Sequence, residues 1–305
     1  MSPIYPTLPE QLTDQHHAAF RAHGYIAFEQ LLSPESLEAA REAMSRIVRL
    51  LHGEAVAGSD TVRYAPPQDG VANYSGASIH HNAGGSLSFE HSKDPLAVPS
   101  EQAELMLRKL FHFEKLDPYY TDLVRSDLTR GVIEQLLGES AILFQVMALV
   151  KPARFGSEKP WHQDNAYFSF APLDRIVGAW IALDDATPEN GCMHVIPGGH
   201  RTGARQHIHD MDCRIEPDLL DVERAVPVPL PAGGAMFFYG MLPHQTPPNR
   251  SDRRRRALQF HYRGESTRQF DPEEYARDVF VDPDGHPSSC AAAKQARPET
   301  TEQPA

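Results

Sequence analysis

Cysteine and long apolar runs are both scarce in this sequence. Among its 305 residues there are three cysteines, Cys192, Cys213 and Cys290, and none of them forms a CxxC pair. An odd, sparse set of thiols favours a reducing compartment over a disulfide framework. No stretch approaches the roughly 20 apolar residues that span a bilayer, so we expect no membrane partner.

Positive charge is also in short supply. The formal net charge is −12, with 29 lysines and arginines against 41 acidic residues. Nucleic-acid binding needs a basic surface that displaces counterions, so we expect no nucleic-acid partner. The N-terminal residues lack the basic segment and apolar run of a secretory signal. Together these absences predict a cytoplasmic protein.

Helical patterns come first in the chain and strand patterns follow. Ser33 and Pro34 predict a helix start, because a capping residue followed by proline is typical of that position. Residues 101–113 also have helical character. From residue 141 onwards, short segments rich in β-branched and aromatic residues are separated by Gly, Pro, Asn and Asp. This order predicts an antiparallel sandwich or barrel with helices packed on one side.

We expect one domain over residues 1–282. Its helices would occupy about residues 12–140 and its strand-rich core about residues 141–265. Residues 54–100 lack clear periodicity and are rich in Gly, Ser, Asn and Pro, which suits either a lid or a mobile surface insertion. Residues 283–305 have low hydrophobicity, and we expect a disordered tail there.

A histidine and an aspartate stand two positions apart in the segment WHQDNAYF, residues 161–168. On extended backbone, His162 and Asp164 point toward a common site. Two histidines and one carboxylate on one face of a metal form the facial triad of non-haem Fe(II) oxygenases. His244 follows the expected strand GAMFFYG and could supply the second histidine. In a chain with 16 histidines this pattern is weak by itself.

The segment after His244 strengthens the hypothesis. If RRRRALQFHYR, residues 253–263, is a strand, Arg255, Gln259 and His261 face one side and Leu258 the other. The polar side suits a wet cavity. An arginine in such a cavity is suited to bind a carboxylate, because its planar fork matches that group.

These segments resemble the phytanoyl-CoA dioxygenase family, a branch of the Fe(II)- and 2-oxoglutarate-dependent oxygenases. Residues 162–201 contain His-Gln-Asp, an Ala-Trp strand, Glu-Asn-Gly-Cys and Ile-Pro-Gly-Gly-His, where the family usually has Ser in place of Gly199. In residues 244–263, Arg255 stands 11 positions after the histidine, as in the family. The resemblance extends over roughly residues 12–265 and is weaker before residue 140.

The resemblance implies a mainly β fold with flanking helices, a double-stranded β-helix of the cupin-like jelly-roll type. It implies His162, Asp164 and His244 as the iron ligands. The residues it implies for binding 2-oxoglutarate are Arg255, Thr246 in place of the family's serine, Lys109 and Trp180.

The implied enzyme is a dioxygenase that uses Fe(II), 2-oxoglutarate and O2 to hydroxylate an unactivated C–H bond of a small metabolite, releasing succinate and CO2. Related halogenases replace the carboxylate ligand by a small residue, so Asp164 favours hydroxylation. One alternative is a phytanoyl-CoA-type acyl-CoA 2-hydroxylase. Its CoA phosphates would need basic residues near the cavity mouth, for which the candidates are Arg175, Arg253, Arg254 and Arg256.

Two further alternatives belong to other classes. A non-catalytic jelly-roll binding protein usually loses a metal ligand or the anchoring arginine. A cupin-type metalloenzyme without 2-oxoglutarate typically uses more histidines and has no such arginine. Dependence of activity on 2-oxoglutarate separates the first hypothesis from both.

Overall fold

We describe the protein from a computed structural model, in which residues 3–67, 74–91, 94–290 and 292 are described. The helices are α1 Asp14–His23, α2 Pro34–Val56, α3 Ser100–Glu104, α4 Pro118–Arg125, α5 Asp127–Leu137 and α6 Pro272–Glu274. The strands are β1 Ile4–Tyr5, β2 Tyr25–Phe28, β3 Val62–Ala65, β4 Ser75–His81, β5 Ser86–Glu90, β6 Leu107–Phe111, β7 Ala141–Lys151, β8 Lys159–His162, β9 Phe170–Ala171, β10 Ile176–Ala182, β11 Met193–Val195, β12 His207–His209, β13 Cys213–Ile215, β14 Val226–Val228, β15 Ala235–Tyr239, β16 His244–Thr246, β17 Arg255–Gly264 and β18 Arg268–Gln269.

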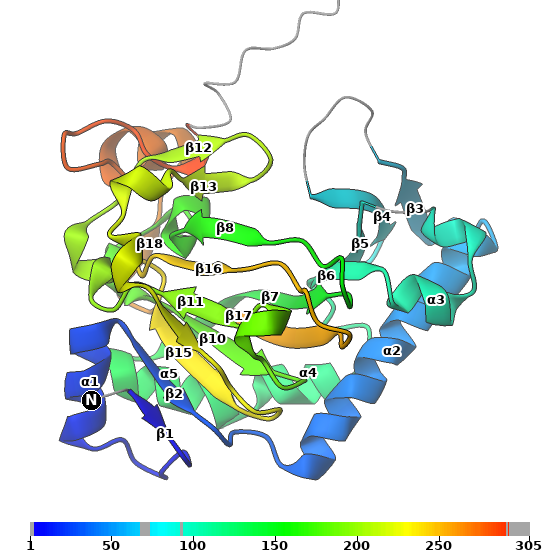
Figure 1. The fold of residues 1–305 in the computed structure, drawn as a ribbon, viewed down its shortest axis with the longest axis horizontal. Coiled ribbons are helices and arrows are strands. Elements are labelled where there is room, and N and C mark those ends of the chain that lie inside the picture. Colours follow the sequence, from blue (N-terminus) through cyan, green and yellow to red (C-terminus); the bar gives the residue numbers. More distant parts are fainter. Residues whose placement is uncertain (1–2, 68–73, 92–93, 291, 293–305) are drawn as a thin grey trace, which may run out of the picture.

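A ten-stranded sheet is the largest element of the fold. Its strand order is β1-β2-β15-β10-β17-β7-β6-β5-β4-β3. Helices α2, α4 and α5 lie along one face of this sheet (Figure 1). Apolar side chains of the helices and of that face, such as Ile47, Val132 and Phe260, share one buried core. The cavity that Arg255 and His261 line lies on the other face.

A four-stranded sheet, in the order β14-β11-β16-β8, covers the other face of the central strands. A second core that includes Trp180, Val195 and Phe238 joins the two sheets. The two sheets and the flanking helices agree with the expected mainly β, jelly-roll architecture. Burial on both faces of β10 explains why this strand reads as a continuous apolar run.

The local predictions for α2 and β17 are confirmed. The Ser33 side chain accepts a hydrogen bond from the Ser36 amide, and Pro34 occupies the first helical position. Along β17, Arg255 and His261 line a cavity between the sheets, whereas Leu258 packs into the core on the helix side. The alternation therefore separates polar from apolar side chains as expected.

Two sequence-based predictions need correction. Residues 101–113 do not form a helix: α3 ends at Glu104, and β6 follows and places Lys109 on a strand. Because β6 pairs with both β5 and β7, sheet hydrogen bonding overrides its local helical preference. Residues 54–100 are also not one irregular loop, since β3, β4 and β5 extend the large sheet there. Residues 68–73 and 92–93 of that stretch lie outside the described residues.

The C-terminal segment packs on the hairpin of β12 and β13 (Figure 1). Cys213 and Cys290 form a disulfide, with a Cα–Cα distance of 5.8 Å, whereas Cys192 is free and buried. The expectation that the sequence holds no disulfide is therefore wrong for this pair, whose separation of 77 residues leaves no local signal. Ser288, Ser289 and Cys290 are buried, although a disordered tail was expected from residue 283. Residues 291 and 293–305 lie outside the described residues.

Across the ranges that the structure describes, no helix combines the length and the apolar character needed to cross a membrane.

Candidate active site

Three side chains from the small sheet and its adjoining turn converge at one point in the cavity. His162 ends β8, His244 begins β16, and these two residues are paired across the strands. Asp164 opens a 3-10 helix, Asp164–Tyr167, immediately after β8. The Asp164 Oδ1 atom lies 3.2 Å from His162 Nε2 and 3.6 Å from His244 Nε2. These ligand atoms lie within 4.8 Å of one another, close enough to bind one metal ion.

Backbone carbonyls orient both histidines for this task. His162 Nδ1 lies 2.8 Å from the Pro160 oxygen, and His244 Nδ1 lies 2.9 Å from the Leu242 oxygen. A carbonyl oxygen only accepts, so Nδ1 carries the proton in each ring. The Nε2 lone pair of each histidine is then free to bind a metal, which is the usual arrangement for a metal-binding histidine.

Burial keeps the two imidazoles neutral. Burial, followed by the neighbouring His244 and Lys159, lowers the pKa of His162 to about 3. Burial also lowers the pKa of His244. For Asp164 burial alone would raise the pKa, but His244 and His261 outweigh it and hold this pKa well below the ordinary value. Neutral imidazoles and an ionised carboxylate are the protonation states that bind a metal ion.

Two residues of β17 hold the other oxygen of Asp164. His261 Nε2 lies 2.8 Å and Gln259 Nε2 3.2 Å from Asp164 Oδ2. Since an ionised carboxylate only accepts, both nitrogens donate to it. Tyr275 from the C-terminal segment supports the same turn, because its hydroxyl donates to the Asn165 carbonyl at 2.8 Å. Asp164 is thereby fixed with Oδ1 directed toward the histidines.

The opposite end of the cavity contains polar hydrogens without acceptors. Arg255 is 1% exposed, and in the described part of the chain its guanidinium bonds only the Leu149 carbonyl, at 2.9 Å. Its Nε and the Trp180 Nε1 are buried donors without a partner among those residues. The Arg255 guanidinium carbon lies 5.5 Å from the centroid of the Trp180 ring. A buried unpaired arginine is unfavourable unless an anion completes it. Thr246 lines the same cavity, so the donor set fits a carboxylate.

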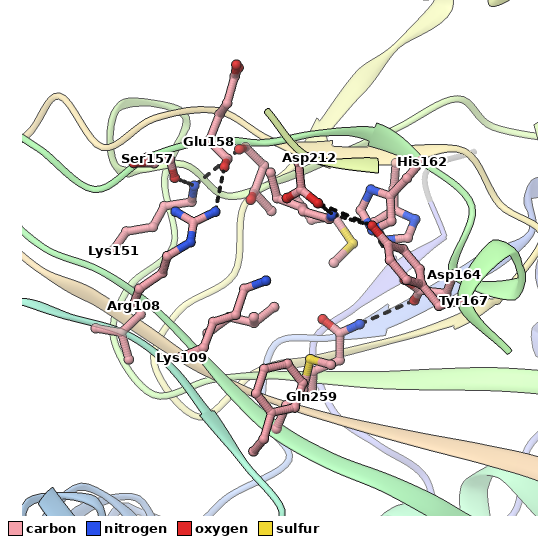
Figure 2. A pocket seen from close by; sticks show the side chains of 18 of the residues that line it. Arg108, Lys109, Lys151, Ser157, Glu158, His162, Asp164, Tyr167, Asp212 and Gln259 are labelled. Atoms are coloured by element: carbon pink, nitrogen blue, oxygen red, sulfur yellow. Dashed lines mark hydrogen bonds and ion pairs between the residues drawn. The ribbon is translucent and has the colours of Figure 1, made fainter. Parts of the chain in front are cut away.

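Lys109 reaches the cavity from β6. Figure 2 shows its amine directed into the open space, on the side opposite Tyr167 and Asp212. Burial, and next the adjacent Arg108, lowers the pKa of Lys109 to about 7. The structure thus brings Lys109 to the same cavity as Arg255 and Thr246, whereas Trp180 lies behind Arg255 and does not line it.

The entrance wall carries charged groups that the sequence reasoning missed. Lys159 Nζ lies 2.8 Å from Asp212 and 2.6 Å from the Tyr167 hydroxyl. Arg108 donates to Glu90 at 3.1 Å and to the Glu158 carbonyl at 3.1 Å (Figure 2). These residues come from separate strands and loops with no spacing in common. For Gln259 and His261 the sequence did contain a signal, because the alternation along β17 places both side chains on its cavity side.

A comparison with protein-family models identifies one family. The model described as phytanoyl-CoA dioxygenase matches residues 20–257 of the chain. Among curated proteins, a phytanoyl-CoA dioxygenase domain-containing protein 1 from Danio rerio is 29% identical over 280 residues. That match covers 87% of this chain and 94% of the relative.

Solved structures share the fold. EvdO2 from Micromonospora carbonacea var. aurantiaca, complexed with 2-oxoglutarate, has a TM-score of 0.60 and 23% identity, covering 87% of this chain and 95% of EvdO2. EctD from S. alaskensis with bound Fe has a TM-score of 0.62 and 20% identity, covering 88% of this chain and 86% of EctD. At these identities the likeness establishes the fold alone.

Proposed function

The chain belongs to the phytanoyl-CoA dioxygenase family of Fe(II)- and 2-oxoglutarate-dependent oxygenases, and we propose that it hydroxylates an unactivated C–H bond of a small metabolite. His162, Asp164 and His244 would hold the iron, and Arg255 with Thr246 and Lys109 would bind the distal carboxylate of 2-oxoglutarate. The observation that carries the proposal is one cavity with a facial triad at one end and an unpaired buried arginine at the other.

The contacts indicate which role each residue of the site would have. When bound, the cofactors supply the oxidising chemistry, in which 2-oxoglutarate is converted to succinate and CO2 and one oxygen atom of O2 enters the substrate. His261 and Gln259 hold Asp164 so that one oxygen faces the metal position. The Pro160 and Leu242 carbonyls set the tautomers of the histidine ligands. The Trp180 ring lies beside Arg255, with its centroid 5.5 Å from the guanidinium carbon. Three protein ligands leave three positions for co-substrate and O2.

The acyl-CoA alternative receives less support from the same contacts. Arg256 is paired with Asp184 at 2.7 Å and Arg254 with Glu104 at 2.8 Å, and both point to the face of β17 away from the cavity. Arg175 bonds the Leu137 carbonyl at 3.1 Å. The residues that line the described cavity do not include Arg253 or any of the three arginines named above. The basic residues considered for CoA phosphates are thus paired or placed elsewhere, which favours a free metabolite.

An anaerobic titration tests the proposal without a known substrate. Fe(II) is added to metal-free protein, and 2-oxoglutarate is then titrated while the visible spectrum is recorded. We expect a saturable charge-transfer band that is abolished in Asp164→Ala and weakened in Arg255→Ala. The exposed residues Asp218 and Arg49 provide matched controls, since Asp218→Ala and Arg49→Ala should leave the band unchanged. Absence of a band in folded wild-type protein would favour the binder or the cupin-type alternative.

A further inference from the structure

One polar group in the cavity belongs neither to the triad nor to the carboxylate-binding end. The Oε1 atom of Gln145 is buried and has no hydrogen-bond partner among the described residues. Gln145 lines the cavity from β7. A buried amide carbonyl without a donor is destabilising by about 1–3 kcal/mol, so such a group is retained where a ligand completes it.

The position of Gln145 is suited to contact a substrate. Gln145 pairs directly with His261 across β7 and β17, and His261 in turn donates to Asp164. The amide therefore lies about one side chain away from the hydrogen-bond partner of a metal ligand. Phe111 and Phe168 line the cavity beside it, and the Phe168 ring packs edge-on against His261, with 4.9 Å between centroids. A molecule that reaches the metal position thus passes aromatic side chains and two unpaired acceptors among the described residues, Gln145 Oε1 and His261 Nδ1.

The charges at the entrance argue against an anionic substrate. Arg108 is neutralised by Glu90 and Lys159 by Asp212. Lys151 already donates to the carbonyl oxygens of Ser157 and Thr246. Under the proposed function, Lys109 and Arg255 are occupied by 2-oxoglutarate. The described entrance then offers no uncommitted cation to a carboxylate or phosphate of the substrate.

We propose that the substrate is an uncharged molecule with an apolar skeleton and an O–H or N–H donor, and that Gln145 is a specificity-determining residue whose side-chain carbonyl accepts that donor. This inference rests on the proposed function and deepens it by naming the class of substrate. The donor anchors the molecule at Gln145, while the aromatic walls hold its skeleton near the metal position.

Matched probe compounds test the inference before the natural substrate is known. The protein is loaded with Zn(II), which keeps the sample diamagnetic and prevents turnover, and with 2-oxoglutarate. Ligand-observed NMR then measures the affinity for cyclohexanol, its methyl ether and cyclohexanecarboxylate. We expect wild-type protein to bind the alcohol about tenfold more tightly than the ether or the carboxylate, since only the alcohol completes the acceptor.

Variants at residue 145 provide the second comparison. Gln145→Leu removes the acceptor and should abolish the preference for the alcohol, whereas Gln145→Glu keeps an acceptor and should retain it. Gln102→Leu, at an exposed position on α3, is the matched control and should behave as wild type. Equal or undetectable binding of the three probes to wild-type protein, or an unchanged preference in Gln145→Leu, would overturn the inference. The same spectra also report whether 2-oxoglutarate binds to the protein. If 2-oxoglutarate binds but the probes show no preference, only this inference fails. If 2-oxoglutarate does not bind, the proposed function fails and this inference fails with it.

Discussion

Arg108 and Arg255 line the same cavity and are both buried, 5% and 1% exposed, yet their surroundings differ. Arg108 faces the buried carboxylate of Glu90, which also accepts from the amide and hydroxyl of Ser157. Arg255 has no carboxylate partner among the described residues and bonds only the Leu149 carbonyl there, whereas the Nε of both arginines lacks an acceptor. A buried guanidinium with a carboxylate partner holds a wall together, whereas a buried guanidinium without a counter-charge marks the place of a ligand. The two ends of the cavity can be distinguished on this basis.

The largest effect is expected from breaking the paired end. Arg108→Met leaves the Glu90 carboxylate, itself 2% exposed, without its cation. Removing one partner of a buried pair typically costs 3–5 kcal/mol, so the free energy of unfolding should fall by about that amount in denaturant titrations. The double variant Arg108→Met, Glu90→Gln should recover most of the loss. A single variant as stable as wild type would show that the pair has no structural role.

The entrance wall is also held covalently. Asp212, the partner of Lys159, is adjacent to Cys213, whose disulfide closes a loop of 77 residues. Loop entropy predicts that Cys290→Ser lowers the free energy of unfolding by about 4 kcal/mol. Reductant should destabilise wild-type protein and the Cys192→Ala control but have no further effect on Cys290→Ser. Identical unfolding of wild-type protein with and without reductant would contradict this prediction.

Substitution of Arg255 should weaken 2-oxoglutarate binding without lowering stability, in contrast to substitution of Arg108. Arg255→Met removes the charge-assisted bonds to 2-oxoglutarate, and the dissociation constant should rise at least about 100-fold, or about 3 kcal/mol. Stability without 2-oxoglutarate should not fall, because a buried uncompensated cation is removed. Calorimetric titration and denaturant unfolding measure the two quantities. The dissociation constant of Arg255→Lys for 2-oxoglutarate should lie between those of wild-type protein and Arg255→Met, since lysine keeps the charge but lacks the planar fork. A loss of stability without a loss of affinity would reverse the assignment of the two arginines.

A smaller effect is expected where the metal position meets β17. His261→Leu removes a donor from the second oxygen of Asp164, and such partners of metal ligands typically affect metal affinity 10–100-fold. Fe(II) titration under anaerobic conditions measures the change. His91→Leu, at an exposed histidine outside the triad, is the control. Unchanged affinity in the His261 variant would mean that Gln259 alone is sufficient to orient Asp164.

The smallest effect concerns pH. The pKa of Lys109 is lowered by burial to about 7, so this amine is protonated below pH 7 and becomes neutral above it. A protonated amine attracts a carboxylate, so 2-oxoglutarate should bind more weakly as the pH rises from 6.5 to 8.5, by up to about tenfold. Lys109→Arg stays charged and should bind tightly across this range, whereas Lys109→Met should bind weakly throughout. An equally steep pH dependence in Lys109→Met would exclude this amine as its cause.

Much of the fold could be predicted from local patterns. The cap at Ser33 and the strands after residue 141 are encoded by neighbouring residues, and the structure contains them. The strand β6 could not be predicted, because its conformation depends on pairing with β5 and β7, which come from elsewhere in the chain. The disulfide was missed for the same reason, since only the packing of the C-terminal segment brings Cys290 to Cys213.

For the candidate site, the sequence by itself determined which residue types could meet. The His-x-Asp spacing, the histidine after a strand and the alternation of β17 are all short-range patterns, and they led to His162, Asp164, His244 and Arg255. Only the tertiary structure decided which polar groups are satisfied and which are not. Pairing of Arg108 with Glu90, and the free carbonyl of Gln145, depend on contacts between segments far apart in the chain. Hydrogen bonding is a property of neighbours in space, and so the cavity's preference for a ligand emerges only after folding.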